Sequence, residues 1–256
     1  NRPFGSYRPG EPFRDYPFAP EPADLRRIER ELRLEEILGG ATLASDAEVV
    51  ALAIETMRAI GLKRIRARIG HIGMLRAFLP FDAADQARIL HALDKKNFAM
   101  LDDELTRLGQ PALADPLKRL VALHGSATVL TQAQAILGGK GSTAFEYLKQ
   151  VADQLAAYGI PASEYEFDMG VVRGLDYYTG LVFELDSPNL GAEKQVGGGG
   201  AYTLAEVLGG EAVAQTGFAL GVDRLVMAAE AEGVFAAARG IDAYVVPIGD
   251  RTRGKA

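Results

Sequence analysis

The sequence predicts an α+β fold in which a sheet is flanked by helices and carries a helical insertion. Residues 164–235 are expected to run strand, strand, glycine turn, helix, strand, helix. Residues 82–137 place apolar side chains at three- and four-residue intervals, as in Ile89, Leu90 and Leu93, which is typical of helices. Between the first helix and this insertion, Lys63–Gly70 alternates basic and apolar residues and indicates a strand with one polar face.

Composition limits the class of protein. The chain has 256 residues, 48% of them hydrophobic, which is enough for one large domain or a domain with an appendage. Its net charge of −6 argues against a broadly basic surface for nucleic acid. With no cysteine and three scattered histidines, we expect no protein-built metal site. No apolar run reaches about 18 residues and the start does not resemble a signal peptide, so we expect a cytoplasmic protein without membrane contact.

The first 38 residues divide into two parts. Residues 1–23 are rich in proline and glycine and cannot form a regular helix. Residues 24–38 are dense in arginine and glutamate, which fits a solvated helix, whereas the alternation of Leu32 and Leu34 fits a strand towards the end. Gly39-Gly40 would stop either element.

A helix, a strand and a short helix follow. Ser45–Glu48 forms a capping box that opens a helix to about Ile60, and Gly61 ends it. The basic residues of the strand at Lys63–Gly70 are more simply explained by solvation than by tRNA contact. A short helix is expected around Ile72–Phe78.

The second half contains the remaining strands. Thr143–Glu146 is expected to cap a helix that ends near Tyr158. Val196–Gly200 ends a strand, and its glycines would let the backbone approach a ligand or another chain closely, although a surface turn is the alternative. Gln215–Leu225 is a strand that leads into a helix. Asp242–Ile248 starts a further strand.

The segment Arg173–Glu184 is the most informative part of the chain. It reads Arg-Gly-Leu-Asp-Tyr-Tyr-Thr-Gly-Leu-Val-Phe-Glu, a turn that leads into a strand. Polar groups on a central strand cost free energy unless they meet partners, and a small polar ligand is one such partner. The alternative is a surface hairpin whose tyrosines cover a sheet edge.

Several segments together resemble the histidyl-tRNA synthetases. Arg173–Glu184 is similar to the first histidine-pocket motif of that family, and Leu190–Ala205 is similar to the second in its archaeal-type form. Gly217–Leu225 resembles the third class-defining motif, and Ser45–Val50 resembles the helix after motif two. The front of the chain departs from the pattern, because motif one is not found and Leu32 stands where the family has a pocket glutamine.

The resemblance implies a class II aminoacyl-tRNA synthetase fold, with an antiparallel sheet flanked by helices and a homodimeric assembly. Arg173 would be catalytic, beside the histidine carboxylate and the α-phosphate of ATP, and a Mg²⁺ ion would bridge phosphates. Arg224 would hold the triphosphate, and Arg14 would be the remnant of the motif-two arginine, with Arg8 as its rival. The residues expected to contact histidine are Glu36, Tyr177, Tyr178, Gly198, Gly199 and Tyr202.

The resemblance also divides the chain. Residues 1–81 and 141–238 would form two parts of the catalytic-like domain, residues 82–140 the helical insertion, and residues 239–256 the start of an anticodon-binding-like domain. Two functions fit. One is a histidine–tRNA ligase of protein biosynthesis, whose partners are histidine, ATP and histidine tRNA. The other is the synthetase-like regulatory subunit of ATP phosphoribosyltransferase, which pairs with a catalytic subunit.

Overall fold

The structure is a computed structural model that describes residues 32–40, 42–172, 177–207 and 209–235. The predictions for the proline-rich start, for Arg14 and Arg173, and for the strand at Asp242–Ile248 lie outside these residues. Within the described part of the chain, no helix is long and apolar enough to cross a membrane.

A seven-stranded sheet with the order β1-β7-β6-β5-β2-β4-β3 forms the centre of the molecule. Its strands are β1 Leu32–Leu38, β2 Arg66–His71, β3 His124–Gly125, β4 Tyr165–Asp168, β5 Tyr178–Asp186, β6 Gln195–Tyr202 and β7 Gln215–Gly221. Neighbouring strands are antiparallel except β2 and β4, which are parallel. The predicted α+β sheet flanked by helices is therefore confirmed, and the parallel pair makes the sheet mixed.

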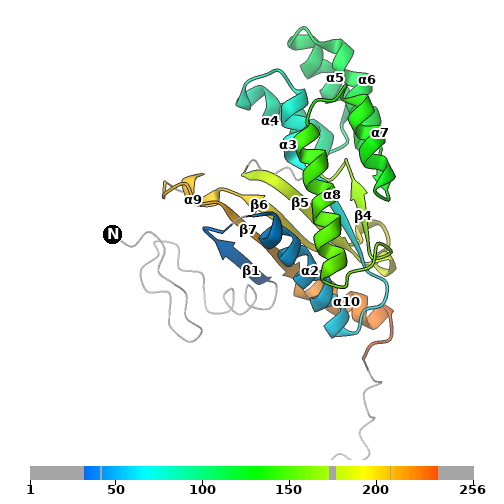
Figure 1. The fold of residues 1–256 in the computed structure, drawn as a ribbon. Helices are drawn as coiled ribbons and strands as arrows, with labels where there is room; N and C mark the ends of the chain where they lie inside the picture. The colour runs from blue at the N-terminus through cyan, green and yellow to red at the C-terminus, as the bar shows by residue number, and fades with distance from the viewer. Residues whose placement is uncertain (1–31, 41, 173–176, 208, 236–256) are drawn as a thin grey trace, which may run out of the picture.

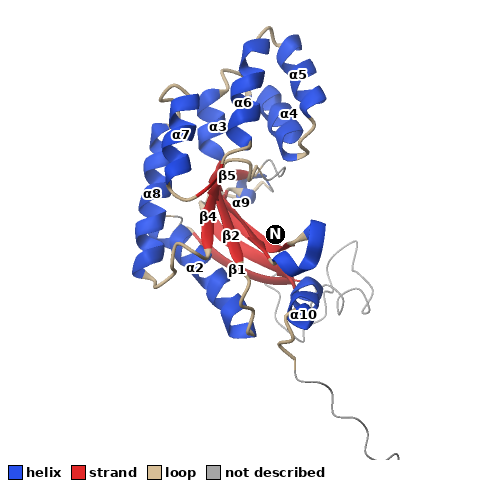
Figure 2. Cartoon of the chain, turned by 90° about the vertical axis from the view of Figure 1, so that its right-hand side faces the viewer, coloured by secondary structure: helices blue, strands red, loops and turns tan. Residues whose placement is uncertain are grey.

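The helices lie on one face of the sheet and at its ends. They are α2 Leu43–Ile60, α3 Ile72–Phe78, α4 Ala83–Asp94, α5 Phe98–Arg107, α6 Ala114–Val121, α7 Thr128–Ile136, α8 Ser142–Ala157, α9 Leu204–Val207 and α10 Val222–Ala231. Two 3₁₀ helices, η1 Pro111–Leu113 and η2 Pro188–Glu193, complete the elements described. Helices α4 to α7 stand together beyond one end of the sheet (Figure 1). Helices α2 and α8 cover one of its faces (Figure 2).

The alternation of side chains separates an apolar face from a polar face. Ile69, Phe183, Leu185 and Phe218 are buried in the main core that α2 and α8 help to form. The opposite face of β2 and β5 carries charged side chains, and Arg68 lies directly across from Glu184. The apolar face explains why the strands fold onto the helices. A functional site is therefore expected on the polar face.

The predicted N-terminal caps of two helices shift in the structure. The first residue of α2 is Leu43 because Thr42, rather than Ser45, is its N-cap. The Thr42 backbone N–H donates to Ser45 Oγ at 2.6 Å, and the Ser45 N–H donates to Thr42 Oγ1 at 3.3 Å. Gly61 ends the helix in the left-handed conformation, as predicted. Helix α8 begins after Gly141 without a side-chain cap, so the predicted cap at Thr143 was wrong.

Two ambiguities in the sequence are resolved by strand pairing. Residues 32–38 form β1, which pairs with β7, so the strand interpretation holds for this part of 24–38. The prediction that residues 82–137 are wholly helical was wrong at β3, which pairs with β4 at the edge of the sheet. A two-residue strand is too short to leave a periodic pattern in the sequence.

The glycine run lies inside β6 rather than at the end of a strand, which corrects the prediction for Val196–Gly200. A Cβ atom on Gly199 would lie 1.9 Å from the carbonyl oxygen of Gly217 on β7. Replacement of Gly199 by alanine is therefore expected to lower the free energy of unfolding by at least about 3 kcal/mol, since the backbone must move. Urea unfolding would measure this. Gly40→Ala is the control, because its Cβ would meet Ile37 at an ordinary 3.5 Å; equal losses would contradict the argument.

His71 makes the stability of the fold depend on pH. Its Nδ1 accepts the N–H of Gly73 at 3.1 Å and so caps α3, while its ring meets Tyr147 edge-on at 5.4 Å. Burial lowers the pKa of His71 to about 4. The unfolded chain has a pKa near 6.5 at this position, so the stability present above about pH 6.5 is lost as pH falls towards 4, by about 3 kcal/mol. Urea unfolding across this range would measure the loss.

His71→Asn is the matched variant, because asparagine can still cap α3 but does not titrate. Asp46 accepts the Tyr147 hydroxyl at 2.7 Å, and burial raises the pKa of this carboxyl against that hydrogen bond. Protonation of Asp46 therefore stabilises the folded protein as pH falls, which is opposite to the effect of His71. This contribution is the same in the natural protein and in His71→Asn. The difference between them isolates His71, and parallel pH profiles would contradict the prediction.

Candidate functional site

Three tyrosines form a cluster on the polar face of the sheet, and we take this cluster as the wall of a candidate ligand pocket, the tyrosine pocket. Tyr178 of β5 lies directly across from Tyr202 of β6, and their ring centroids are 6.0 Å apart. Tyr177 completes the group, with its ring 4.8 Å from Tyr178 and 5.6 Å from Tyr202. Val171 and Val182 pack with these rings in a small cluster separate from the main core. The rings make a rigid wall with polar tips, which suits a small ligand that has both flat and polar parts.

Glu36 of β1 reaches this pocket across the sheet. Its strand position pairs with Gly217, which also pairs with Gly200, so Glu36 and the tyrosine strand share a face. The Tyr202 hydroxyl donates a hydrogen bond to Glu36 Oε1. Burial raises the pKa of Tyr202, and the bond to the Glu36 carboxylate raises it further, so the hydroxyl stays protonated. Glu36 is itself exposed and can accept a second hydrogen bond from a ligand.

Arg76 of α3 holds the backbone of the tyrosine pocket in place. Its Nη2 donates to the backbone carbonyl of Tyr178 at 3.1 Å. Gln86 of α4 donates from its amide to the carbonyls of Leu79 and Phe81, each at 3.0 Å, and so ties the insertion to the end of α3. The helical insertion is therefore linked to the tyrosine pocket through α3, a connection that the sequence did not predict.

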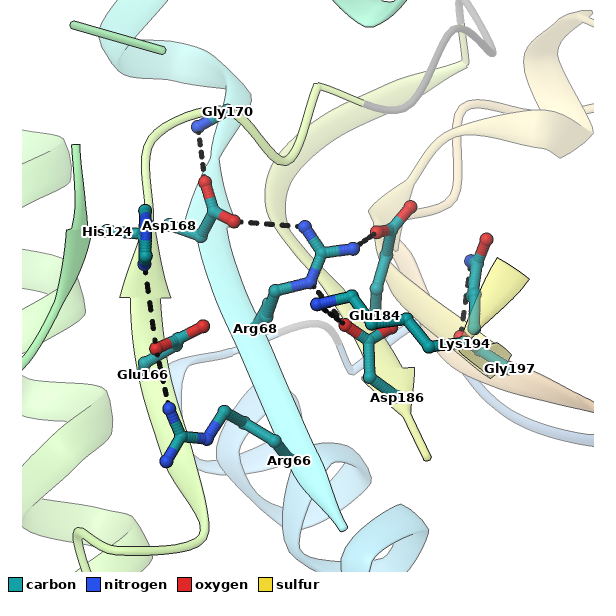
Figure 3. A network of polar contacts seen from close by, with 11 residues as sticks. Arg66, Arg68, His124, Glu166, Asp168, Gly170, Glu184, Asp186, Lys194 and Gly197 are labelled. Carbon is teal, nitrogen blue, oxygen red and sulfur yellow. Dashed lines mark hydrogen bonds and ion pairs between the residues drawn. The ribbon is translucent and has the colours of Figure 1, made fainter. Parts of the chain in front are cut away.

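A charged cleft of about 760 Å³ lies further along the same face. Its floor includes Arg68, which is ion-paired with carboxylates from two neighbouring strands (Figure 3). Arg68 Nε lies 2.7 Å from Asp186 Oδ2 and Nη1 lies 2.9 Å from Asp168 Oδ2, while Nη2 pairs with Glu184. Lys194 Nζ also contacts Asp186, at 3.0 Å. Burial by itself lowers the pKa of Arg68, but the hydrogen bond to Asp168 and the charges of the other carboxylates outweigh it and raise the pKa.

Arg224 lines this cleft from the first turn of α10, as predicted for a helix that follows β7. Its Nε donates to the carbonyl of Gln195 at 2.5 Å. Gln195 is at the opposite end of β6 from Tyr202, a separation of roughly 23 Å along an extended strand. Arg224 therefore belongs to the cleft, and a ligand that joined it to the tyrosine pocket would have to be long.

The predicted site residues fall into three groups. Glu36, Tyr177, Tyr178 and Tyr202 come together in one cluster. Gly198 and Gly199 lie in the middle of β6, and Gly199 is required by the close approach of β7 before any ligand is considered. Arg224 lies apart from the pocket, and Arg14 and Arg173 lie outside the described residues.

The sequence missed the residues around Arg68. The polar face predicted for Lys63–Gly70 exists, and Arg66 is exposed on it as solvation predicts. Arg68 is instead enclosed, with its side chain 19% exposed and surrounded by Asp168, Glu184 and Asp186. The acidic alternation in Glu166–Asp168 and Glu184–Asp186 was the available signal, because acids repeated every second residue share one face of a strand.

The fold and the polar face together define a class II aminoacyl-tRNA synthetase-like protein. A solved structure from Bacillus halodurans, described as an ATP phosphoribosyltransferase regulatory subunit/histidyl-tRNA synthetase, matches with a TM-score of 0.67 and 27% identity. That match covers 77% of this chain and 52% of the other. The family model for histidyl-tRNA synthetase matches residues 34–225, and the chain belongs to this family.

Curated relatives carry both of the functions considered. The histidine–tRNA ligase of Methanosphaerula palustris is 42% identical over 195 residues, which is 75% of this chain and 45% of the relative. The ATP phosphoribosyltransferase regulatory subunit of Symbiobacterium thermophilum is 36% identical over 216 residues, 82% of this chain and 53% of that protein. The chain thus spans about half the length of the curated relatives it matches.

Proposed function

We propose that this chain binds free histidine in the tyrosine pocket and activates it with ATP, as part of a histidine–tRNA ligase. The observation that carries the proposal is the Glu36 carboxylate held by the Tyr202 hydroxyl at the edge of the tyrosine rings. A neutral imidazole has one N–H donor, for which a carboxylate is a strong acceptor, and its flat ring suits an aromatic wall. The homologous ligase named above supports histidine as the ligand.

The activation step would use two arginines in separate roles. The histidine carboxylate attacks the α-phosphorus of ATP, the bond to the leaving pyrophosphate breaks, and histidyl-adenylate forms. Arg173 would stabilise the charge that develops at the reacting atoms, and Arg224 would hold the phosphates in the cleft through its planar fork. Transfer of histidine to histidine tRNA, in a homodimer, would complete the reaction.

Mg²⁺ does not fit the carboxylates that the cleft provides. Asp168 and Asp186 of the cleft, with the adjoining Glu184, are already bonded to Arg68, and Glu166 of the cleft is paired with Arg66. We therefore assign no step to a magnesium ion on these groups, and we expect Mg²⁺ to enter with the phosphates of ATP.

Histidine-dependent ATP–pyrophosphate exchange tests the proposed activation step, because it needs neither tRNA nor transfer. We expect exchange that saturates with histidine. Calorimetry with histidine alone tests the pocket separately. Uptake of histidine without exchange would reject the ligase and retain the pocket, whereas absence of both would reject the whole proposal.

Glu36→Gln tests the contact to the imidazole. The variant keeps the shape of the side chain but loses its charge, and a hydrogen bond to a charged group contributes about 1.5–3 kcal/mol. Calorimetry is expected to show a Kd for histidine raised by about 10- to 100-fold. Glu48→Gln is the control, since Glu48 is an exposed glutamate on α2. An unchanged Kd in Glu36→Gln would remove this residue from the pocket.

The second candidate is the regulatory subunit of ATP phosphoribosyltransferase. It is favoured by the Symbiobacterium thermophilum relative, which matches more of this chain than the ligase does. In this function the pocket would sense histidine without activating it. Light scattering of the chain mixed with an ATP phosphoribosyltransferase catalytic subunit would show a complex, and a chain that exchanges pyrophosphate and forms no complex would reject this candidate.

A further inference from the structure

We propose that Arg68 is a resident cation that fills the carboxylate cluster at the floor of the cleft, so that this cluster does not take up a divalent metal ion. The cluster consists of Asp168, Glu184 and Asp186. The inference concerns the cleft itself and does not rest on the proposed function.

The guanidinium of Arg68 uses each of its nitrogens for a different carboxylate. Nε takes Asp186 at 2.7 Å, Nη1 takes Asp168 at 2.9 Å, and Nη2 takes Glu184. Figure 3 shows the carboxylates spread around the edge of the planar group. This arrangement matches the fork of N–H donors on arginine, which no point charge reproduces.

Other donors occupy part of the remaining acceptor capacity. Asp168 Oδ1 accepts the backbone N–H of Gly170 at 2.7 Å, and Asp186 Oδ2 also contacts Lys194 Nζ at 3.0 Å. The side chain of Asp186 is only 3% exposed. Its Oδ1 is buried without a hydrogen-bond partner among the described residues, so this oxygen keeps unused acceptor capacity.

With Arg68 holding the carboxylates apart, this geometry is unsuitable for Mg²⁺. That ion requires oxygen ligands in near-octahedral geometry at about 2.0–2.1 Å, converging on one point. Here the carboxylates converge on the separate nitrogens of a guanidinium. With Arg68 in place, no three histidine or acidic side chains among the described residues are positioned to hold a metal ion, so a site in its absence requires these carboxylates to move together. Anionic groups that enter the cleft would therefore meet the N–H donors of Arg224 and Lys194 rather than a metal ion held by the protein.

Titration with Mn²⁺ alone, followed by electron paramagnetic resonance, tests the inference on the whole chain. We expect no saturable Mn²⁺ site in the natural protein. Arg68→Met removes the charge while keeping an unbranched side chain, and it is expected to gain one saturable site and to be stabilised against heat by Mn²⁺. Arg68→Lys keeps a positive charge and is expected to gain none.

Two results would overturn the inference. One is saturable Mn²⁺ binding by the natural protein that is lost in Glu184→Gln, because the carboxylates would then be available despite Arg68. This comparison does not depend on the Arg68 variants being folded. The other is a folded Arg68→Met variant, checked by circular dichroism, that gains no site, because Arg68 would then not be what excludes the metal.

Discussion

Arg173→Ala is expected to reduce histidine-dependent ATP–pyrophosphate exchange by at least about 10²- to 10³-fold, with no loss of fold. The size follows from the removal of a preorganised positive group from a reaction that develops negative charge, for which single-donor deletions cost that much. In the sequence, Arg173 directly follows the buried residue Val172 and comes shortly before Tyr177 and Tyr178 of the pocket. Exchange rates measured at saturating histidine and ATP would check the prediction.

The control for this variant is Arg119→Ala, which removes an arginine that is 63% exposed and paired only at 3.5 Å with Asp115 on α6. Its exchange rate is expected to match that of the natural protein. Thermal unfolding should give the same midpoint for all three proteins. An Arg173→Ala protein that exchanges at the natural rate would remove this arginine from the chemistry and leave the tyrosine pocket as a binding site.

The sequence predicted correctly those elements that are determined by a few neighbouring residues. The short helix at Ile72–Phe78 and the left-handed cap at Gly61 agree with the structure because a periodic run and a glycine stop act within a few residues. The start of α2 was placed wrongly, because Thr42 and Ser45 satisfy each other one turn earlier than the predicted box. Two N-cap candidates three residues apart cannot be ranked from sequence when each can cap the N–H groups of the turn that follows it.

For the site too, the residues that could be predicted are those with a signal in a short stretch of sequence, and the residues that were missed depend on contacts between distant parts of the chain. Glu36 and the tyrosines were found through the family resemblance, and strand register brings them onto one face. The environment of Arg68 could not be found in this way, because its acidic partners follow 100 or more residues later in the chain. Alternation in β2 shows that Arg68 shares a face with other polar groups. It cannot show whether water or carboxylates meet that face.

Arg68→Met is expected to lower the free energy of unfolding by about 3–5 kcal/mol near neutral pH, as is found when one partner of a buried ion pair is removed. The remaining carboxylates of Asp168, Glu184 and Asp186 would repel one another in a site of low exposure. Acid relieves this repulsion and so stabilises the folded variant. The deficit against the natural protein should therefore shrink as pH falls. Urea unfolding of both proteins at neutral and acidic pH would measure it.

Arg66→Met is the matched control, because Arg66 lies two residues away on the same strand and face. Its side chain is 53% exposed and, within the described part of the chain, makes one ion pair, to Glu166 at 3.0 Å. Exposed pairs contribute about 0–1 kcal/mol, so this variant should lose little stability at any pH. Equal losses of stability in the two variants would show that Arg68 contributes no more than a surface cation. Its role as the cation that fills the carboxylate cluster would then have to be abandoned. A large loss of stability in Arg68→Met alone would show that the folded sheet depends on a cation at this point. It would also show that one residue of β2 balances the charge of the carboxylates on the two neighbouring strands, β4 and β5.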